Sequence, residues 1–61
     1  MMKGKLRGDT TWTPIEGETL DSIASRYFGH GFTVIETTGA VTIINPVTNE
    51  IECEYQEEAA Q

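Results

Sequence analysis

The sequence has little cysteine and little positive charge. It contains a single cysteine, Cys53, so an internal disulfide is impossible and a zinc site built from several cysteines is excluded. Only four lysines and arginines stand against ten aspartates and glutamates, which gives a formal net charge of −6. Because phosphate neutralisation needs clustered basic residues, we expect no direct binding to nucleic acid. Docking on an anionic membrane is disfavoured for the same reason.

Long apolar runs are also missing. No segment approaches the ~18 apolar residues that a membrane span needs, and no apolar stretch follows the first basic residues. We therefore expect neither a membrane span nor a signal peptide, and the lone cysteine favours a reducing, cytoplasmic location. The length of 61 residues allows a single small domain (1–61) with little stability to spare.

Residues 3–15 have the composition of extended chain. Three basic residues alternate with Gly and Leu, and a threonine-rich stretch around Trp12 favours β structure. Pro14 and Gly17 then interrupt the pattern. We expect one or two short strands here, with a break near residues 8–9. Trp12 is predicted to enter the core, with an exposed ligand platform as the alternative.

Residues 19–28 predict an amphipathic helix. Apolar residues at i, i+3, i+4, i+7 and i+8 share one helical face: Leu20, Ile23, Ala24, Tyr27 and Phe28. Thr19 is suited to cap the first turn, and Gly29 to end the helix in the left-handed conformation. A helix of about ten residues is marginal alone. We therefore expect its apolar face, including Tyr27 and Phe28, to pack on a sheet.

The apolar period changes to two after the helix, which predicts strands at residues 32–37, 40–44 and 50–55. A turn at 38–39 and a loop at 45–49 separate them. Ile51, Cys53 and Tyr55 are predicted to face the core, and residues 56–61 to form a frayed acidic tail. The predicted fold class is α+β, with a single helix packed on a small antiparallel sheet in the order β-α-β-β-β.

Two rows of opposite charge have the same strand spacing. Lys3, Lys5 and Arg7 form the basic row, and Glu50, Glu52 and Glu54 form the acidic row. If the first and last strands pair, the rows lie side by side and stabilise the sheet. If they do not pair, the glutamates form an acidic stripe that can grip a basic partner.

No combination of residues predicts catalysis. His30 lies between two glycines after the helix, and no serine or cysteine is placed near it by a known motif. Cys53 is predicted to point inward, where a thiol behaves as a small apolar group. Carboxylates two residues apart on a strand are ~7 Å apart, too far to share one metal ion. We therefore expect no enzyme activity, no cofactor and no metal.

Residues 12–29 resemble the first half of a LysM domain. The stretch from 17 to 29, Gly-Glu-Thr-Leu-Asp-Ser-Ile-Ala-Ser-Arg-Tyr-Phe-Gly, is similar to the LysM turn and helix, and residues 12–15 take the place of its first strand. The resemblance implies glycan binding through Gly17, Glu18, Thr19 and Leu20. Residues 32–44 are β-branched and predict strands where a LysM domain has its second helix.

The overall pattern also resembles small phage-encoded inhibitors of host enzymes. The first hypothesis is therefore a small, acidic, non-catalytic protein that binds a partner protein with a basic surface, such as a nucleic-acid-processing host enzyme. The predicted contact surface comprises Glu50, Glu52, Glu54, Glu57, Glu58 and Trp12. The alternatives are a LysM-like glycan-binding or phage tail-associated module, and a structural assembly subunit that self-associates through an open sheet edge.

Overall fold

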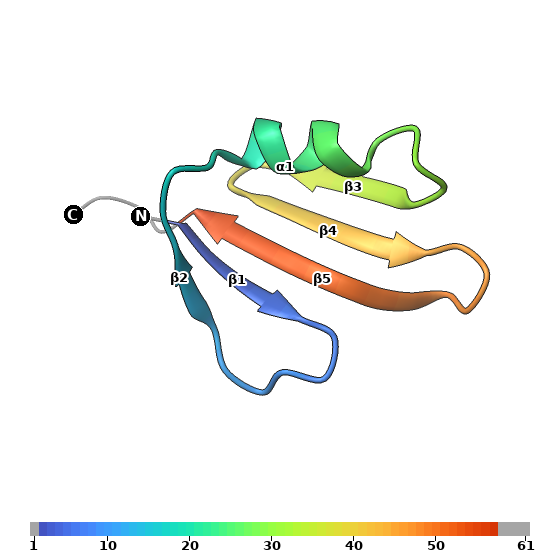
Figure 1. Ribbon diagram of the computed structural model, residues 1–61, viewed down its shortest axis with the longest axis horizontal. Coiled ribbons are helices and arrows are strands. Elements are labelled where there is room, and N and C mark those ends of the chain that lie inside the picture. The colour runs from blue at the N-terminus through green and yellow to red at the C-terminus, as the bar shows by residue number, and fades with distance from the viewer. Residues whose placement is uncertain (1, 58–61) are drawn as a thin grey trace.

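A five-stranded antiparallel sheet and one helix make up residues 2–57, which are the part of the chain described by the computed structural model (Figure 1). This confirms the α+β class and the single helix packed on an antiparallel sheet. The elements in chain order are β1 (Met2–Leu6), β2 (Thr13–Ile15), α1 (Leu20–Tyr27), β3 (Thr33–Thr37), β4 (Ala40–Asn45) and β5 (Glu50–Glu57).

The strands lie in the order β2-β1-β5-β4-β3, and every neighbouring pair is antiparallel. Strand β5, the last in sequence, therefore pairs with β1 on one side and with β4 on the other. The predicted order β-α-β-β-β has one strand too few, because residues 2–15 fold back on themselves as the hairpin β1–β2. The long connection between these strands contains Gly8, which has a φ of +89°.

Helix α1 begins at its predicted Thr19 cap but ends one residue before the predicted Phe28. The Thr19 hydroxyl oxygen accepts a hydrogen bond from the Ser22 N–H at 3.1 Å, and the Ser22 hydroxyl oxygen accepts one from the Thr19 N–H at 3.0 Å. This reciprocal pair satisfies two N–H groups that the helix leaves without partners. Gly29, with a φ of +82°, follows the last turn. No helix within residues 2–57 has the length and apolar character needed to cross a bilayer.

Phe28 does not join the core as predicted. The helix ends at Tyr27, and Phe28 has extended backbone angles of −64° and 128°, so its side chain leaves the helical periodicity. It is 76% exposed. Tyr27 does pack inward, and its ring meets that of Phe32 edge to face at a centroid distance of 5.4 Å.

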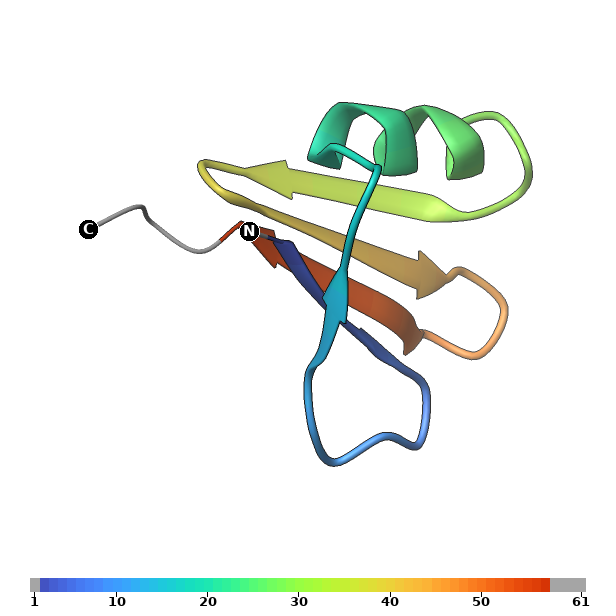
Figure 2. The ribbon, with the colours of Figure 1, turned by 60° about the vertical axis from the view of Figure 1, so that its left-hand side comes forward.

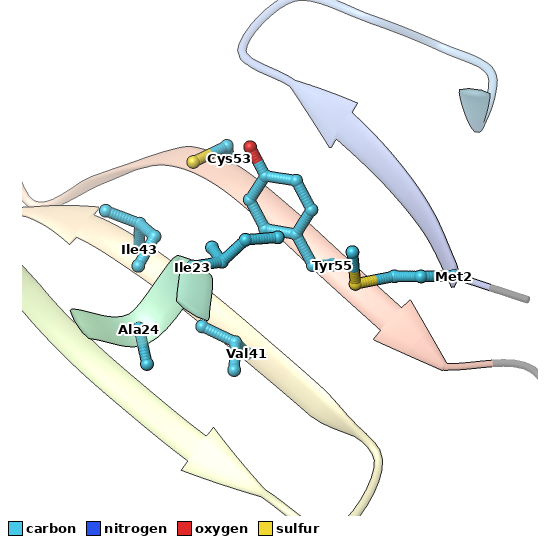
Figure 3. Close-up of a cluster of buried hydrophobic side chains, with 7 residues drawn as sticks. All are labelled: Met2, Ile23, Ala24, Val41, Ile43, Cys53 and Tyr55. Atoms are coloured by element: carbon cyan, nitrogen blue, oxygen red, sulfur yellow. The ribbon is translucent and has the colours of Figure 1, made fainter. Parts of the chain in front are cut away.

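The core lies between α1 and one face of the sheet (Figures 2 and 3). The helix backbone lies over β3, β4 and β5, and Met2 of β1 reaches the same buried cluster as Ile23 of α1. Ile23, Val41 and Ile43 are the largest fully buried side chains. The whole buried cluster, which confirms the inward orientation of Cys53 and Tyr55, comprises Met2, Ile23, Ala24, Val41, Ile43, Cys53 and Tyr55.

Ile51 is 46% exposed, although the alternation of β5 predicts that it is buried. Cys53 pairs with Ile43, but the next pair is Ile51 with Ile44, so β5 uses one residue more than β4 at this point. This β-bulge shifts the register by one residue, which moves Ile51 off the core face. Strand β5 also extends to Glu57, so residues 56–57 belong to the sheet and not to a tail. The rest of the predicted tail, residues 58–61, lies outside the described part.

Gly4 allows the Tyr55 ring to lie directly on β1. The two residues are paired across β1 and β5, and Gly4 has an ordinary strand conformation. A Cβ atom at position 4 would approach Tyr55 Cε1 to 2.8 Å, Tyr55 Cδ1 to 2.9 Å and Ile15 Cγ1 to 3.2 Å. Glycine is therefore required here by close packing, not by its backbone freedom.

The substitution Gly4→Ala is expected to lower the free energy of unfolding by about 1–3 kcal/mol, because the added methyl group overpacks this contact. The measurement is urea unfolding followed by Trp12 fluorescence. In a Tyr55→Leu background the ring is absent, so the cost of Gly4→Ala should fall substantially. An equal cost in both backgrounds would show that Tyr55 is not the cause.

Candidate functional site

The predicted charge rows come together across β1 and β5, and Lys3, Lys5 and Glu54 lie on the open face of the sheet, opposite α1. Lys5 is paired with Glu54 across β1 and β5, and Lys3 is paired with Gln56. Of the two interpretations, the structure supports internal pairing. Cross-strand neighbours of opposite sign contribute a few tenths of a kcal/mol up to about 1 kcal/mol each.

Arg7 holds two of the glutamates. Its Nη2 lies 2.9 Å from Glu50 Oε2, and its Nη1 lies 3.2 Å from Glu52 Oε1. The Arg7 N–H also donates to the Glu52 carbonyl oxygen at 2.8 Å, which continues the β1–β5 ladder beyond Leu6. These two carboxylates are therefore compensated within the protein.

Trp12 lies on this open face and not in the core. Ile15 and Thr13 are paired with Met2 and Gly4, so these residues of β2 share the core-facing row of β1. Trp12 falls on the other side by alternation, where the Nζ atoms of two lysines lie over its ring. The distances to the ring centroid are 5.3 Å for Lys3 and 5.4 Å for Lys5, within the range of cation–π interactions.

The predicted acidic contact surface is thus partly engaged by the protein's own cations. Glu50 and Glu52 contact Arg7, Glu54 lies opposite Lys5, and Glu57 ends β5. Trp12 is half-buried beneath the lysines. Glu58 lies outside the described residues. Arg7 therefore compensates Glu50 and Glu52, whereas Glu54 faces Lys5 across the strands without an ion pair among residues 2–57.

The four residues suggested by the LysM resemblance serve the start of α1. Gly17 has a φ of +78°, Thr19 caps the helix, and Leu20 packs against the core. The Glu18 carboxylate accepts a hydrogen bond from the Arg26 guanidinium. Residues 33–45, where a LysM domain has its second helix, form strands β3 and β4 with their connecting turn.

Two carboxylates on the helix side of the sheet, unlike Glu50 and Glu52, have no cationic partner among residues 2–57. Asp21 on α1 and Glu36 on β3 form no ion pair within residues 2–57. Both line an open groove of about 560 Å³ between the helix and the edge strand. The groove is completed by Ala24, Ser25 and Phe28.

The helical wall of this groove is one continuous stripe. Asp21, Ala24 and Ser25 stand at i, i+3 and i+4 on one side of α1, and Phe28, just beyond the end of the helix, extends the same wall. Ala24 forms a buried floor, and Phe28 forms an exposed aromatic wall. The groove therefore combines apolar surface with two unpaired negative charges.

Sequence reasoning missed Glu36, although the pattern contained a signal. Val34 and Glu36 are paired with Ile43 and Val41, both of which are core residues, so the carboxylate stands in the helix-facing row of β3. A charge in the apolar row of a strand is unusual unless it has a partner or a function.

The buried thiol and the two tyrosines form a second cluster of chemical groups. Cys53 and Tyr55 are buried, and the Tyr55 hydroxyl points toward the Cys53 side of the core (Figure 3). Burial raises the pKa of Tyr55 well above its ordinary value, and the neighbouring Cys53 raises it further. His30, in the loop after α1, is exposed. Within residues 2–57, no three His, Cys, Asp or Glu side chains gather in a way that could hold a metal ion.

The raised pKa of Tyr55 makes folding sensitive to alkaline pH. Above about pH 10 the unfolded chain loses the Tyr55 proton while the folded protein retains it, so the free energy of unfolding falls as pH rises. The contribution approaches about 1.4 kcal/mol for each pH unit. Tyr55→Phe should flatten this slope between pH 10 and 12 in urea unfolding. Parallel slopes for the two proteins would contradict the assignment.

Comparison with protein-family models, with curated proteins and with solved structures finds no match for this chain. The groove between α1 and β3 is the place where unpaired charge, exposed aromatic surface and an open strand occur together.

Proposed function

We propose that this protein is a small, non-catalytic binding protein whose partner is a protein with a basic surface, and that the contact is made at the groove between α1 and β3. One observation carries the proposal: Asp21 and Glu36 flank the groove without an ion pair among residues 2–57, while the exposed Phe28 stands beside them. The net negative charge of the chain predicted a partner with a basic surface, and we keep that partner. The proposed contact surface, however, is the groove beside α1 instead of the glutamates of β5.

The physical roles of the groove residues differ. Carboxylates steer a basic partner toward the site and align it, and this effect weakens as salt screens the charges. An exposed aromatic ring supplies buried apolar area when the partner covers it, which slows dissociation. Asp21 and Glu36 give the first effect, and Phe28 gives the second.

The geometry of the reactive side chains supports a non-catalytic role. Cys53 is buried, Ser22 takes part in the helix cap, and His30 lies exposed in a loop. Nucleophilic catalysis needs a nucleophile and a base within hydrogen-bond distance. An enzyme that handles nucleic acid, with its basic groove, fits as the partner, and a phage-type inhibitor would act by covering that groove.

A structural assembly subunit is the second candidate. The observation that favours it is the unpaired edge of β3, because an open strand can pair with a neighbouring chain. Glycan binding has less support in the geometry, since the residues that carry the LysM resemblance already cap and anchor α1.

The test uses two variants with the same change in net charge. Tagged wild-type protein, Asp21→Lys/Glu36→Lys and Glu52→Lys/Glu54→Lys are used as bait in bacterial lysate at low and high salt. The groove variant is expected to lose at least about tenfold of the basic partner recovered at low salt, because it repels what the carboxylates attract. The β5 variant should lose much less.

Circular dichroism and urea unfolding of all three proteins confirm that each bait is folded. A partner lost equally from both variants would indicate a response to net charge alone. If only the β5 variant failed to recover the partner, the glutamates of β5 would be the contact surface, and the proposal would be contradicted.

A further inference from the structure

Strand β3 is an open edge of the sheet. It pairs with β4 on one side, and the strand order leaves its other side without a strand (Figure 1). The opposite edge, β2, is only three residues long and contains Pro14, which has no N–H to donate. Strand β3 has five residues, Thr-Val-Ile-Glu-Thr, with neither proline nor lysine to block pairing.

The groove runs beside this edge, and Figure 2 shows α1 lying along β3. A strand added to β3 would lie about 4.8 Å from it, with alternate side chains on the two faces of the sheet. Side chains on the helix face would enter the groove between Ala24, Phe28 and Glu36. Those on the other face would lie beside Ile35, which is 44% exposed.

The charge of the groove selects the occupant. Glu36 is an inward-pointing charge on an edge strand, a device that opposes pairing with an identical strand. A second copy paired through β3 would bring its own Asp21 and Glu36 to the same groove, and like charges would repel. A segment with lysine or arginine on its helix-facing side would be attracted. Its aliphatic stems would pack on Ala24 and Phe28 while the cationic groups reach the carboxylates.

We infer that β3 and the adjoining groove receive an extended basic segment of the partner protein, which adds to the sheet as a sixth strand with lysine or arginine facing α1 and β-branched residues facing Ile35. This inference rests on the proposed function and specifies how the partner binds. Main-chain hydrogen bonds to β3 provide affinity, and the alternating side chains provide specificity.

The probe is the fluorescently labelled peptide Lys-Val-Lys-Val-Lys-Val-Lys, and the readout is fluorescence anisotropy at low salt. Wild-type protein should bind it, and the same peptide N-methylated at every residue should bind at least about tenfold more weakly, since it keeps its charges but has no backbone N–H. Asp21→Asn/Glu36→Gln should also weaken binding at least about tenfold. The matched control, Glu52→Gln/Glu54→Gln, should bind as wild type does.

Amide hydrogen exchange supplies a second readout, in which the bound peptide should slow exchange at residues 33–37. Equal binding of both peptides, or no slowing at β3, would overturn strand addition while leaving a charge-dependent contact intact. No effect of Asp21→Asn/Glu36→Gln, together with a β5-dependent partner in lysate, would overturn the proposed function itself. A concentration-dependent dimer with protected β3 amides would show that a second copy occupies the edge, which also overturns the inference.

Discussion

The pairing of β1 with β5 is the constraint on which the rest of the structure depends. It joins the two ends of the described chain, places Met2 in the core and lets Tyr55 lie on Gly4. Closing so long a loop costs conformational entropy, which buried apolar contacts and a continuous hydrogen-bond ladder must exceed. Because α1 lies over β3, β4 and β5, the N-terminal hairpin joins the sheet through its pairing with β5.

This pairing also determines where negative charge remains available. Arg7, just after β1, pairs with Glu50 and Glu52, and the ammonium groups of Lys3 and Lys5 lie over the Trp12 ring, so part of the negative charge of β5 is compensated within the protein. Asp21 and Glu36, on the helix side, receive no such compensation among residues 2–57. The carboxylates of Glu50 and Glu52 are thus engaged within the fold, and the proposed contact surface lies on the helix side of the sheet.

Local chemistry in the sequence was sufficient to predict the helix with its Thr19 cap, the three-stranded meander and the inward Cys53. The same local patterns failed where a shift of one residue decides which way a side chain faces. The bulge at Glu52 turns Ile51 away from the core, and the helix ends at Tyr27, so Phe28 leaves its apolar face. Trp12 was misplaced because its face depends on how β2 pairs with β1. The groove joins α1 to β3, and no short-range pattern reveals which side chains of two separate elements become neighbours.

The most direct test of this account is a titration of isotope-labelled protein with a short lysine peptide at low salt, followed residue by residue through backbone amide chemical shifts. We expect the largest changes on residues 21–28, along and just after α1, and on residues 33–37 of β3, and we expect these changes to vanish at high salt. Changes concentrated on residues 50–57 of β5 would contradict it, because they would show that the glutamates opposite β1 are still free to bind a basic partner.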